Sequence, residues 1–333
     1  MQAATKERLQ ELQVIISKMP LEVCCVAVLP EFGVRWREVS RAVRNCRLPM
    51  VPASVARVLC RHVAKSLPDE DVADIVARLR LKLIATQERK WFVIDLLEPT
   101  DEEISVAHLI RALPGRVAQA LTKTRAGRTM RPEVQTVLLG DLLYMSVQLV
   151  SDTKQGGVLY VATPPGQPVA LVSCTTSGLL KASVEGLGFR KHEDAQLFGR
   201  DVKSLLRIHN QNHSEDVNHL AGTPEYNPIP VVTATGIDYT NKTYDEHYVD
   251  NLLGPNPPLL TDLIISCNKP FFDASRLDKK INLTVQLRSE DVSKTLKAWV
   301  SKNAIAPTSD FFQIFHKIKS NKITFQDGDE SND

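Results

Sequence analysis

Hydrophobic positions near the start of the chain recur at helical spacing. Leu9, Leu12, Ile16 and Met19 follow an i, i+3, i+7, i+10 pattern, which predicts a helix with one buried face that ends at Pro20. The proline at residue 68 and the acidic residues at 69–71 favour the first turn of another helix. Other helices are expected over residues 21–29, 34–46 and 52–66. The pattern therefore predicts a compact helical bundle over residues 1–86.

Beyond residue 134 the period of the pattern changes toward two. Residues 87–132 are predicted to be a helical connector with a helix over 104–121, in which residues 90–94 form either a short strand or an apolar turn. Expected after the connector are strands over 134–143, 144–150, 158–162 and 169–173, then helices over 178–187 and 199–209. Residues 87–210 are thus predicted to contain a mixed α/β domain.

The last part of the chain is again mixed. Residues 211–230 are polar and turn-rich, which is typical of a linker, and the acidic tail over 327–333 is expected to be disordered. Between them we expect strands over 231–237, 281–287 and 322–325, and helices over 292–300 and 310–318. These elements predict a second α+β region over residues 231–326, so the fold class is predicted to be α+β.

Composition indicates an ordinary soluble protein. The chain has 333 residues, of which 43% are hydrophobic, and no apolar stretch reaches the length of a membrane span. Lys6, Glu7 and Arg8 interrupt the N-terminus before any apolar run, so no signal peptide is expected. The six cysteines lack metal-site spacing and are expected to be reduced. We therefore expect a soluble intracellular protein without a membrane association.

Charge is distributed unevenly along the chain. Residues 1–132 contain 22 Lys and Arg against 15 Asp and Glu, a balance of +7, and the remainder has a balance of −5. The stretch TKTRAGRTMRPE, residues 122–133, has no acid before Glu133. Arginine suits phosphate, and aromatic residues are not interleaved with these arginines, which favours a duplex backbone over a single strand. The simpler interpretation is a solvated surface loop.

No motif of a known catalytic site occurs in the sequence. Phosphate-binding glycine loops, a nucleophile elbow and metalloprotease signatures are all missing, so an enzyme is not expected, and neither a cofactor nor a metal. Asp69, Glu70 and Asp71 fit the start of a helix better than an acid–base pair. Two alternatives stay open, which are a nucleic-acid enzyme with an unrecognised site and a signalling adaptor of the death-fold class that self-assembles through the N-terminal bundle.

Several segments resemble the centromere protein N family, in the same order along the chain. Residues 281–325 resemble the end of that family, with a strand, a helix, the A-x-A-P motif at 304–307, a helix and a final strand. Residues 16–20 resemble the end of its first helix. Residues 67–76 resemble its last bundle helix, and 89–91 a basic-Trp element. The resemblance covers nearly the whole chain, although no single motif is highly specific.

The resemblance implies a fold and a function. The fold is an N-terminal pyrin-like (death-fold) bundle, a domain similar to that of centromere protein L, and a C-terminal region that forms a heterodimer with centromere protein L. The implied function is recognition of nucleosomes that contain the centromeric histone variant, with recruitment of other constitutive centromere proteins. The implied location is the kinetochore at the centromere of the chromosome, in the nucleus, where the protein supports kinetochore assembly and chromosome segregation.

The resemblance also implies a basic DNA groove between the bundle and the next domain. Lys18, Lys90, Lys181 and Arg200 match basic positions of the family, whereas a further basic pair falls on Met50 and Val51. Arg44 and Arg47 are expected to take the place of that pair. The full expected DNA-binding set is Lys18, Arg44, Arg47, Arg89, Lys90, Arg116, Lys123, Arg125, Arg128, Arg131, Lys181 and Arg200.

A histone contact is implied at the start of the first helix, where the family uses two carboxylates one turn apart. A gap-free alignment puts Lys6 and Gln10 there, and a shift of one residue puts Glu7 and Glu11 there. At helical spacing Glu7 and Glu11 share a face that lies away from the predicted core stripe. They are expected to bind a histone arginine, and the alternative is that they only make the helix soluble.

Overall fold

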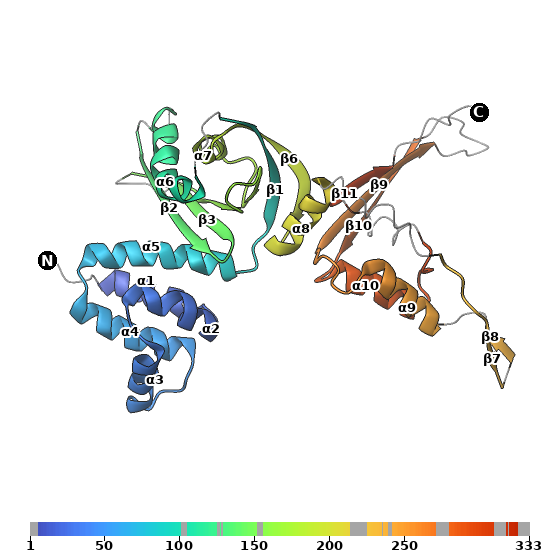
Figure 1. Cartoon of the computed structure of the whole chain (residues 1–333), viewed down its shortest axis with the longest axis horizontal. Helices are drawn as coiled ribbons and strands as arrows, with labels where there is room; N and C mark the ends of the chain where they lie inside the picture. The colour runs from blue at the N-terminus through green and yellow to red at the C-terminus, as the bar shows by residue number, and fades with distance from the viewer. Residues whose placement is uncertain are drawn as a thin grey trace. The chain divides into compact units, whose positions relative to one another are not determined.

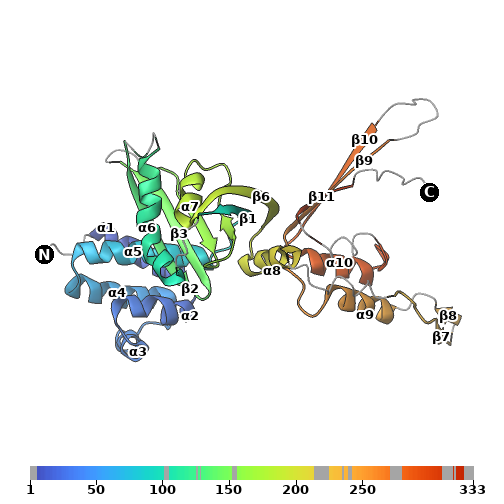
Figure 2. The same ribbon diagram turned by 45° about the horizontal axis from the view of Figure 1, so that its top comes forward.

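The computed structural model describes residues 6–100, 105–124, 127, 129–151, 156–213, 225–234, 236–238, 242–270, 280–309, 318 and 320–325. The chain forms two compact units. The first consists of Met1–Arg89 and Asp95–Glu193, and the second of Lys90–Ile94 and Asp194–Asp333. Figures 1 and 2 show that α5 lies in the first unit between the other bundle helices and a β-sheet with its covering helices.

The N-terminal bundle begins the first unit. Its helices are α1 (Lys6–Ser17), α2 (Leu21–Val23), α3 (Trp36–Asn45), α4 (Pro52–Ser66) and α5 (Asp69–Thr86). The segment expected as one helix over 21–29 instead passes from α2 into the π-helical turn η1 (Cys24–Val28) and the 3₁₀ turn η2 (Leu29–Phe32). Gly33, at φ +63°, ends it. The other predicted bundle helices are confirmed, with small shifts of their ends.

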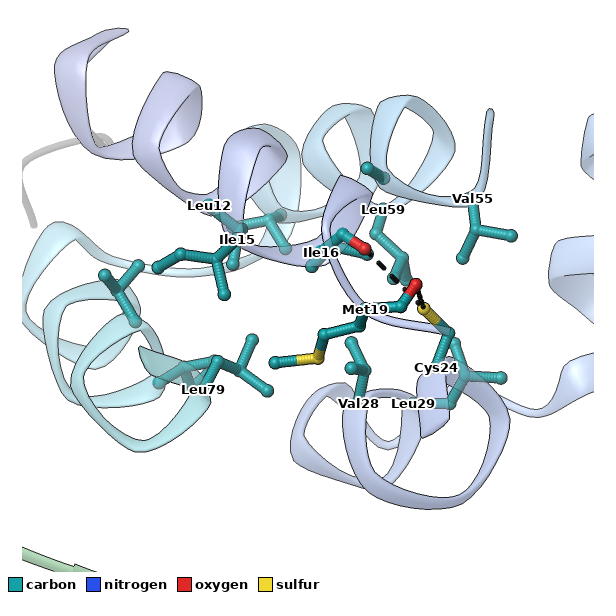
Figure 3. Close-up of a cluster of buried hydrophobic side chains, with 14 of the residues drawn as sticks. Leu12, Ile15, Ile16, Met19, Cys24, Val28, Leu29, Val55, Leu59 and Leu79 are labelled. Atoms are coloured by element: carbon teal, nitrogen blue, oxygen red, sulfur yellow. Dashed lines mark hydrogen bonds between the residues drawn. The ribbon is translucent and has the colours of Figure 1, made fainter. Parts of the chain in front are cut away.

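Aliphatic side chains from all of the bundle helices fill one core. Leu12 and Ile16 of α1, Leu59 of α4 and Leu79 of α5 are completely buried. Met19 reaches between them, as Figure 3 shows. Each such side chain contributes roughly 1.5–3 kcal/mol by leaving water, so the apolar stripe that predicted these helices is also what holds them together.

A six-stranded sheet forms the rest of the first unit and extends into the second. Its strands are β1 (Trp91–Pro99), β2 (Arg131–Leu139), β3 (Leu142–Val150), β4 (Leu159–Thr163), β5 (Val169–Val172) and β6 (Phe189–Gly199), in the order β2-β3-β4-β5-β1-β6. The strands β2 to β5 pair antiparallel. Helices α6 (Val106–Thr122) and α7 (Leu180–Leu187) pack together, and α5 packs against β2 and β3.

The sheet corrects several expectations from the sequence. Residues 90–94 begin a nine-residue strand rather than a turn, so the segment 87–132 is not mainly helical. The turn between β2 and β3 lies at Gly140, whose φ is +62°, and not after residue 143. The strand β6 was missed altogether, because only Leu197 and Gly199 of its eleven residues are buried, which leaves no apolar alternation to detect.

The second unit contains α8 (Val202–His213), the hairpin β7 (Val231–Thr233) and β8 (Gly236–Asp238), α9 (Lys242–Leu253) and α10 (Val292–Ser301). A three-stranded sheet has the order β10-β9-β11, with β9 (Asp262–Pro270) antiparallel to β10 (Lys280–Arg288) and parallel to β11 (Lys322–Phe325). The expected strand at the end and the helix at 292 are confirmed.

Other expectations for this unit are wrong or fall outside the described residues. The predicted strand over 231–237 is two short strands, α9 and β9 were missed, and α8 extends to His213, into the predicted linker. Most of the predicted helix over 310–318 and the tail over 327–333 lie outside the described residues. The chain is nevertheless an α+β protein, as predicted.

Candidate nucleic-acid interface

The end of α3 places two of the expected DNA-binding arginines on the surface. Arg44 lies in the last turn, Cys46 caps the helix and Arg47 follows with φ +52°. The N–H of Leu48 donates to the carbonyl of Val43 at 3.1 Å, and the N–H of Arg47 to that of Arg44 at 2.9 Å, which is a Schellman ending. Arg44 and Arg47 are both exposed. An arginine therefore occupies a left-handed position that glycine normally fills.

The start of the bundle carries the proposed histone contact. Lys18 and Val14 are exposed, while Glu11 is half-buried and pairs with Arg80 of α5. The helix α1 includes Glu7, whose side chain lies outside the described residues. The structure therefore shows that Glu11 already has a cationic partner within the bundle, which spacing along the sequence did not indicate.

The basic stretch over residues 122–133 starts at the end of α6. Lys123 caps the helix, and its ammonium lies 3.2 Å from the carboxylate of Glu185 on α7. Both side chains are at least half exposed, so this pair is weak. The helices meet closely at Gly186, where a Cβ atom would collide with Val117. Lys181 is exposed one turn before Glu185 on α7, so the structure brings it near Lys123.

The rest of the stretch leads into β2. Arg131 is the first residue of that strand and is exposed. Arg125 and Arg128 lie outside the described residues. Arg116 lies on α6 and is half-buried, with Nη2 3.8 Å from where a Cβ on Gly188 would be, and it makes an interaction within the protein. Arg116 is thus a poorer candidate for DNA than Lys123 or Arg131.

Two cations around the start of β1 lie over aromatic rings. The guanidinium of Arg89 is 4.6 Å from the ring centre of Tyr160. In the second unit the ammonium of Lys90 is 3.9 Å from the ring centre of Phe198 and 5.2 Å from that of Phe92. Phe92 lies only two residues after Lys90, but Tyr160 and Phe198 are far from Arg89 and Lys90 in sequence, so the sequence gave no sign of those two contacts. Each such contact stabilises by about 0.5–1 kcal/mol at an exposed site.

Arg200 also belongs to the second unit, between β6 and α8. It is exposed and makes an interaction within the protein. The remaining expected residues fall on several parts of the first unit. Arg44 and Arg47 lie at the end of α3, which Figures 1 and 2 both show well separated from α6 and α7, where Lys123 and Lys181 lie.

Three other cations of the first unit, Arg78, Lys82 and Lys191, are paired with acids. Lys82 and Arg78 of α5 both bind Glu31, at 2.6 and 2.9 Å. Burial alone would raise the pKa of Glu31, but the hydrogen bonds and charges of Lys82 and Arg78 outweigh it and lower that pKa. On the exposed surface, Glu98 raises the pKa of Lys191, mainly through their hydrogen bond. By contrast, no described acid forms an ion pair with Arg44, Arg47 or Arg131, which are all exposed.

Comparison with known proteins adds no relative. No family model matches the chain, and no curated protein matches it. Among the described residues there is no group of three or more His, Cys, Asp or Glu side chains placed to hold a metal ion. In the same part of the chain no helix is long and apolar enough to cross a membrane.

Proposed function

We propose that the chain is a non-enzymatic protein of the inner kinetochore. It recognises nucleosomes that contain the centromeric histone variant and recruits other centromere proteins for chromosome segregation. In this proposal the bundle is pyrin-like, the six-stranded sheet belongs to a domain shared with centromere protein L, and residues 231–326 form the heterodimer with centromere protein L. The order of the resembling segments along an α+β chain supports it.

The observation that carries the DNA-binding part is a set of exposed cations without an acidic partner among the described residues. These are Lys18, Arg44, Arg47, Arg131 and Lys181. Cations such as Arg78 and Lys82 on the same unit do have such partners. An uncompensated positive surface attracts a polyanion, and a duplex gains affinity from each phosphate that a cation neutralises because counterions are released.

The histone-reading part of the proposal rests on α1. A histone arginine that binds Glu11 competes with Arg80, which pairs with that carboxylate in the free protein. Both side chains are about half exposed, so exchanging one arginine for another costs less than about 1 kcal/mol. In this arrangement the carboxylate gives the preference for the histone variant, while the basic residues supply most of the affinity.

The test compares two nucleosomes on identical DNA, one with the centromeric histone variant and one with the ordinary histone. The full chain is co-expressed with centromere protein L. A DNA variant carries Arg44→Gln, Arg131→Gln and Lys181→Gln, and a control of equal charge change carries Lys294→Gln, Lys297→Gln and Lys302→Gln on and just after α10. Because α10 lies in the proposed heterodimer region, co-purification with centromere protein L is measured for every variant. Lys294 and Lys297 pair with acids.

We expect the parent protein to prefer the nucleosome that contains the centromeric histone variant. The DNA variant weakens both complexes, and its plot of log affinity against log salt is shallower by about 2–3. The α10 control changes little. A parent that binds neither nucleosome contradicts the proposal as a whole. If the parent binds both nucleosomes equally, the protein binds DNA without distinguishing the histones, and the histone-reading part of the proposal is wrong.

A further inference from the structure

Helix α4 has a buried apolar stripe and an exposed basic stripe. Val55, Leu59 and Val63 are completely buried at i, i+4, i+8 spacing. Two residues after each comes a basic residue at the same spacing, and Arg57, Arg61 and Lys65 are all exposed. An offset of two residues turns a side chain by about 200° around a helix, so the basic stripe points away from the bundle core.

Helix α3 has the same arrangement. Val39 and Val43 are buried, and Arg37 and Arg41 each lie two residues before one of them. Arg44 continues the exposed stripe one turn later. Two helices of the bundle thus present arginines on their outer surfaces, each at a spacing of roughly 5–6 Å between neighbouring Cβ atoms.

A direct contact joins the two stripes. The helices α3 and α4 pack against each other. Nη1 of Arg61 donates a hydrogen bond to Sγ of Cys46, the capping residue of α3, at 3.8 Å. The stripes therefore form one surface, the α3–α4 basic face, which consists of Arg37, Arg41, Arg44, Arg57, Arg61 and Lys65.

The positive charge of this face is uncompensated within the described part of the chain. No described acid forms an ion pair with any of its residues. The one acid on α3, Glu38, accepts a hydrogen bond from the backbone N–H of Arg35 at 3.4 Å, at the start of the helix. Next to the face, Arg47 has a left-handed backbone conformation, which is strained for an arginine. Strain retained beside an unpaired cluster points to a ligand rather than to stability.

The geometry favours a phosphate backbone as that ligand. Paired rows of cations at spacings of roughly 5–10 Å match the repeated charges of a duplex strand, and a guanidinium binds a phosphate with two hydrogen bonds. The face has no aromatic side chain on which a base would stack, which excludes a platform for single strands. Figures 1 and 2 show α3 and α4 on the side of the bundle away from α6 and the sheet.

We infer that the α3–α4 basic face binds the phosphate backbone of duplex DNA, with Arg37, Arg41, Arg57, Arg61 and Lys65 as binding residues in addition to Arg44. The inference rests on the proposed DNA binding and extends it to a surface that α6, α7 and β2 do not contribute to. It makes α4, which neither the resemblance nor the expected residue set included, a DNA-contacting element.

The experiment measures binding of the full chain to a short blunt duplex of mixed sequence at several salt concentrations. An α4 variant carries Arg57→Gln, Arg61→Gln and Lys65→Gln, which are exposed and leave the core intact. A conservative variant carries Arg57→Lys and Arg61→Lys. The α10 control described above removes the same charge elsewhere, and the DNA variant tests the proposed function in parallel. Thermal unfolding confirms that each variant is folded.

We expect the α4 variant to lose at least tenfold in affinity at low salt, with a slope that is shallower by about 2–3, while the α10 control and the conservative variant stay close to the parent. If the α4 variant binds like the parent while the DNA variant is weakened, the proposed function stands and the inference is wrong. If the parent does not bind the duplex, both fail.

If the ligand of the α3–α4 basic face is a protein and not DNA, the experiment gives a different result. An acidic protein surface would use the same cations, and a poly-glutamate peptide serves as its probe. Loss of peptide binding by the α4 variant, without loss of duplex binding, identifies a protein-binding face and overturns the inference.

Discussion

The side-chain oxygen of Asn321 accepts a hydrogen bond from the backbone N–H of Phe198 at 2.6 Å. Its amide nitrogen donates to the carbonyl of Asp262 at 2.5 Å. Its own backbone N–H donates to Gln196, and its carbonyl accepts from Ile264. Asn321 is completely buried, so one polar residue ties the end of β6 to the start of β9 inside the second unit. The strand β11 follows directly from it.

Replacing Asn321 by alanine should destabilise the second unit. The change removes the Asn321 partner of the part-buried N–H of Phe198 and of the part-buried carbonyl of Asp262, at about 1–2 kcal/mol each, so we expect a loss of roughly 2–4 kcal/mol. Urea unfolding of the full chain measures it. The matched control is Ser320→Ala, which removes one partly exposed hydrogen bond, to Lys322. An equal effect of the two substitutions would contradict the role of Asn321.

No sequence pattern indicates the role of Asn321. In general, the pattern predicts only elements that bury a regular apolar stripe. The bundle helices were predictable because each buries one stripe, such as Leu12 and Ile16 of α1. The strand β6 was not, since its core contribution comes from few residues such as Leu197, while charged side chains cover the rest. Among the described side chains of α9, Tyr248, Val249 and Leu252 are the buried ones, and three buried residues within the last two turns are too short a signal to identify a helix.

For the candidate site, exposure of the basic residues was predictable and their partners were not. Arg44, Arg47 and Arg131 are exposed, which agrees with the charged surface expected from the sequence. The contacts of Glu11 with Arg80 and of Arg89 with the Tyr160 ring depend on how distant segments pack. Such pairs arise from the tertiary structure, so periodicity and local charge cannot indicate them.

Arg47→Gly should stabilise the protein and weaken DNA binding at once. Glycine adopts φ +52° without the steric cost that arginine bears, so the free energy of unfolding should rise by up to about 1 kcal/mol. Loss of one phosphate contact should reduce the salt slope for duplex binding by about 1. Chemical unfolding and duplex titration measure the two effects.

The same motif at another helix supplies the control for Arg47. Asn303 follows α10 with φ +54°, and the N–H of Ala304 donates to the carbonyl of Trp299. Asn303→Gly should change stability little, because asparagine tolerates this backbone, and leave DNA binding unchanged. If Arg47→Gly retains full affinity and the parent's slope, the strain at Arg47 has no part in DNA binding.

Glu31 makes the bundle sensitive to acid. Since its folded pKa is lowered from the usual 4.5 by Lys82 and Arg78 against the effect of burial, its stabilisation is complete above the unfolded pKa and is lost as pH falls through the folded one. Glu31→Gln should therefore cost about 2 kcal/mol at neutral pH, because the buried Lys82 loses its counter-ion, and progressively less below pH 4.5.

Unfolding by urea across the pH range tests this sign. The exposed pair of Glu98 and Lys191 provides the control, since Glu98→Gln should cost little at any pH. A gap between parent and Glu31→Gln that stays constant from neutral pH to below pH 4 would show that the charge of Glu31 does not contribute.

Arg80 should act as an internal competitor for the histone arginine. It pairs with Glu11 in the free bundle, so Arg80→Gln leaves that carboxylate open to a partner. A pair at this exposure contributes about 0.2–1 kcal/mol, so the preference for the variant nucleosome should rise by up to about fivefold.

Glu11→Gln should abolish the preference and leave the affinity for naked duplex unchanged. The double variant should resemble Glu11→Gln, because Arg80 acts only through that carboxylate. If Arg80→Gln reduces the preference as much as Glu11→Gln does, the pair only stabilises the bundle, and the histone contact lies elsewhere.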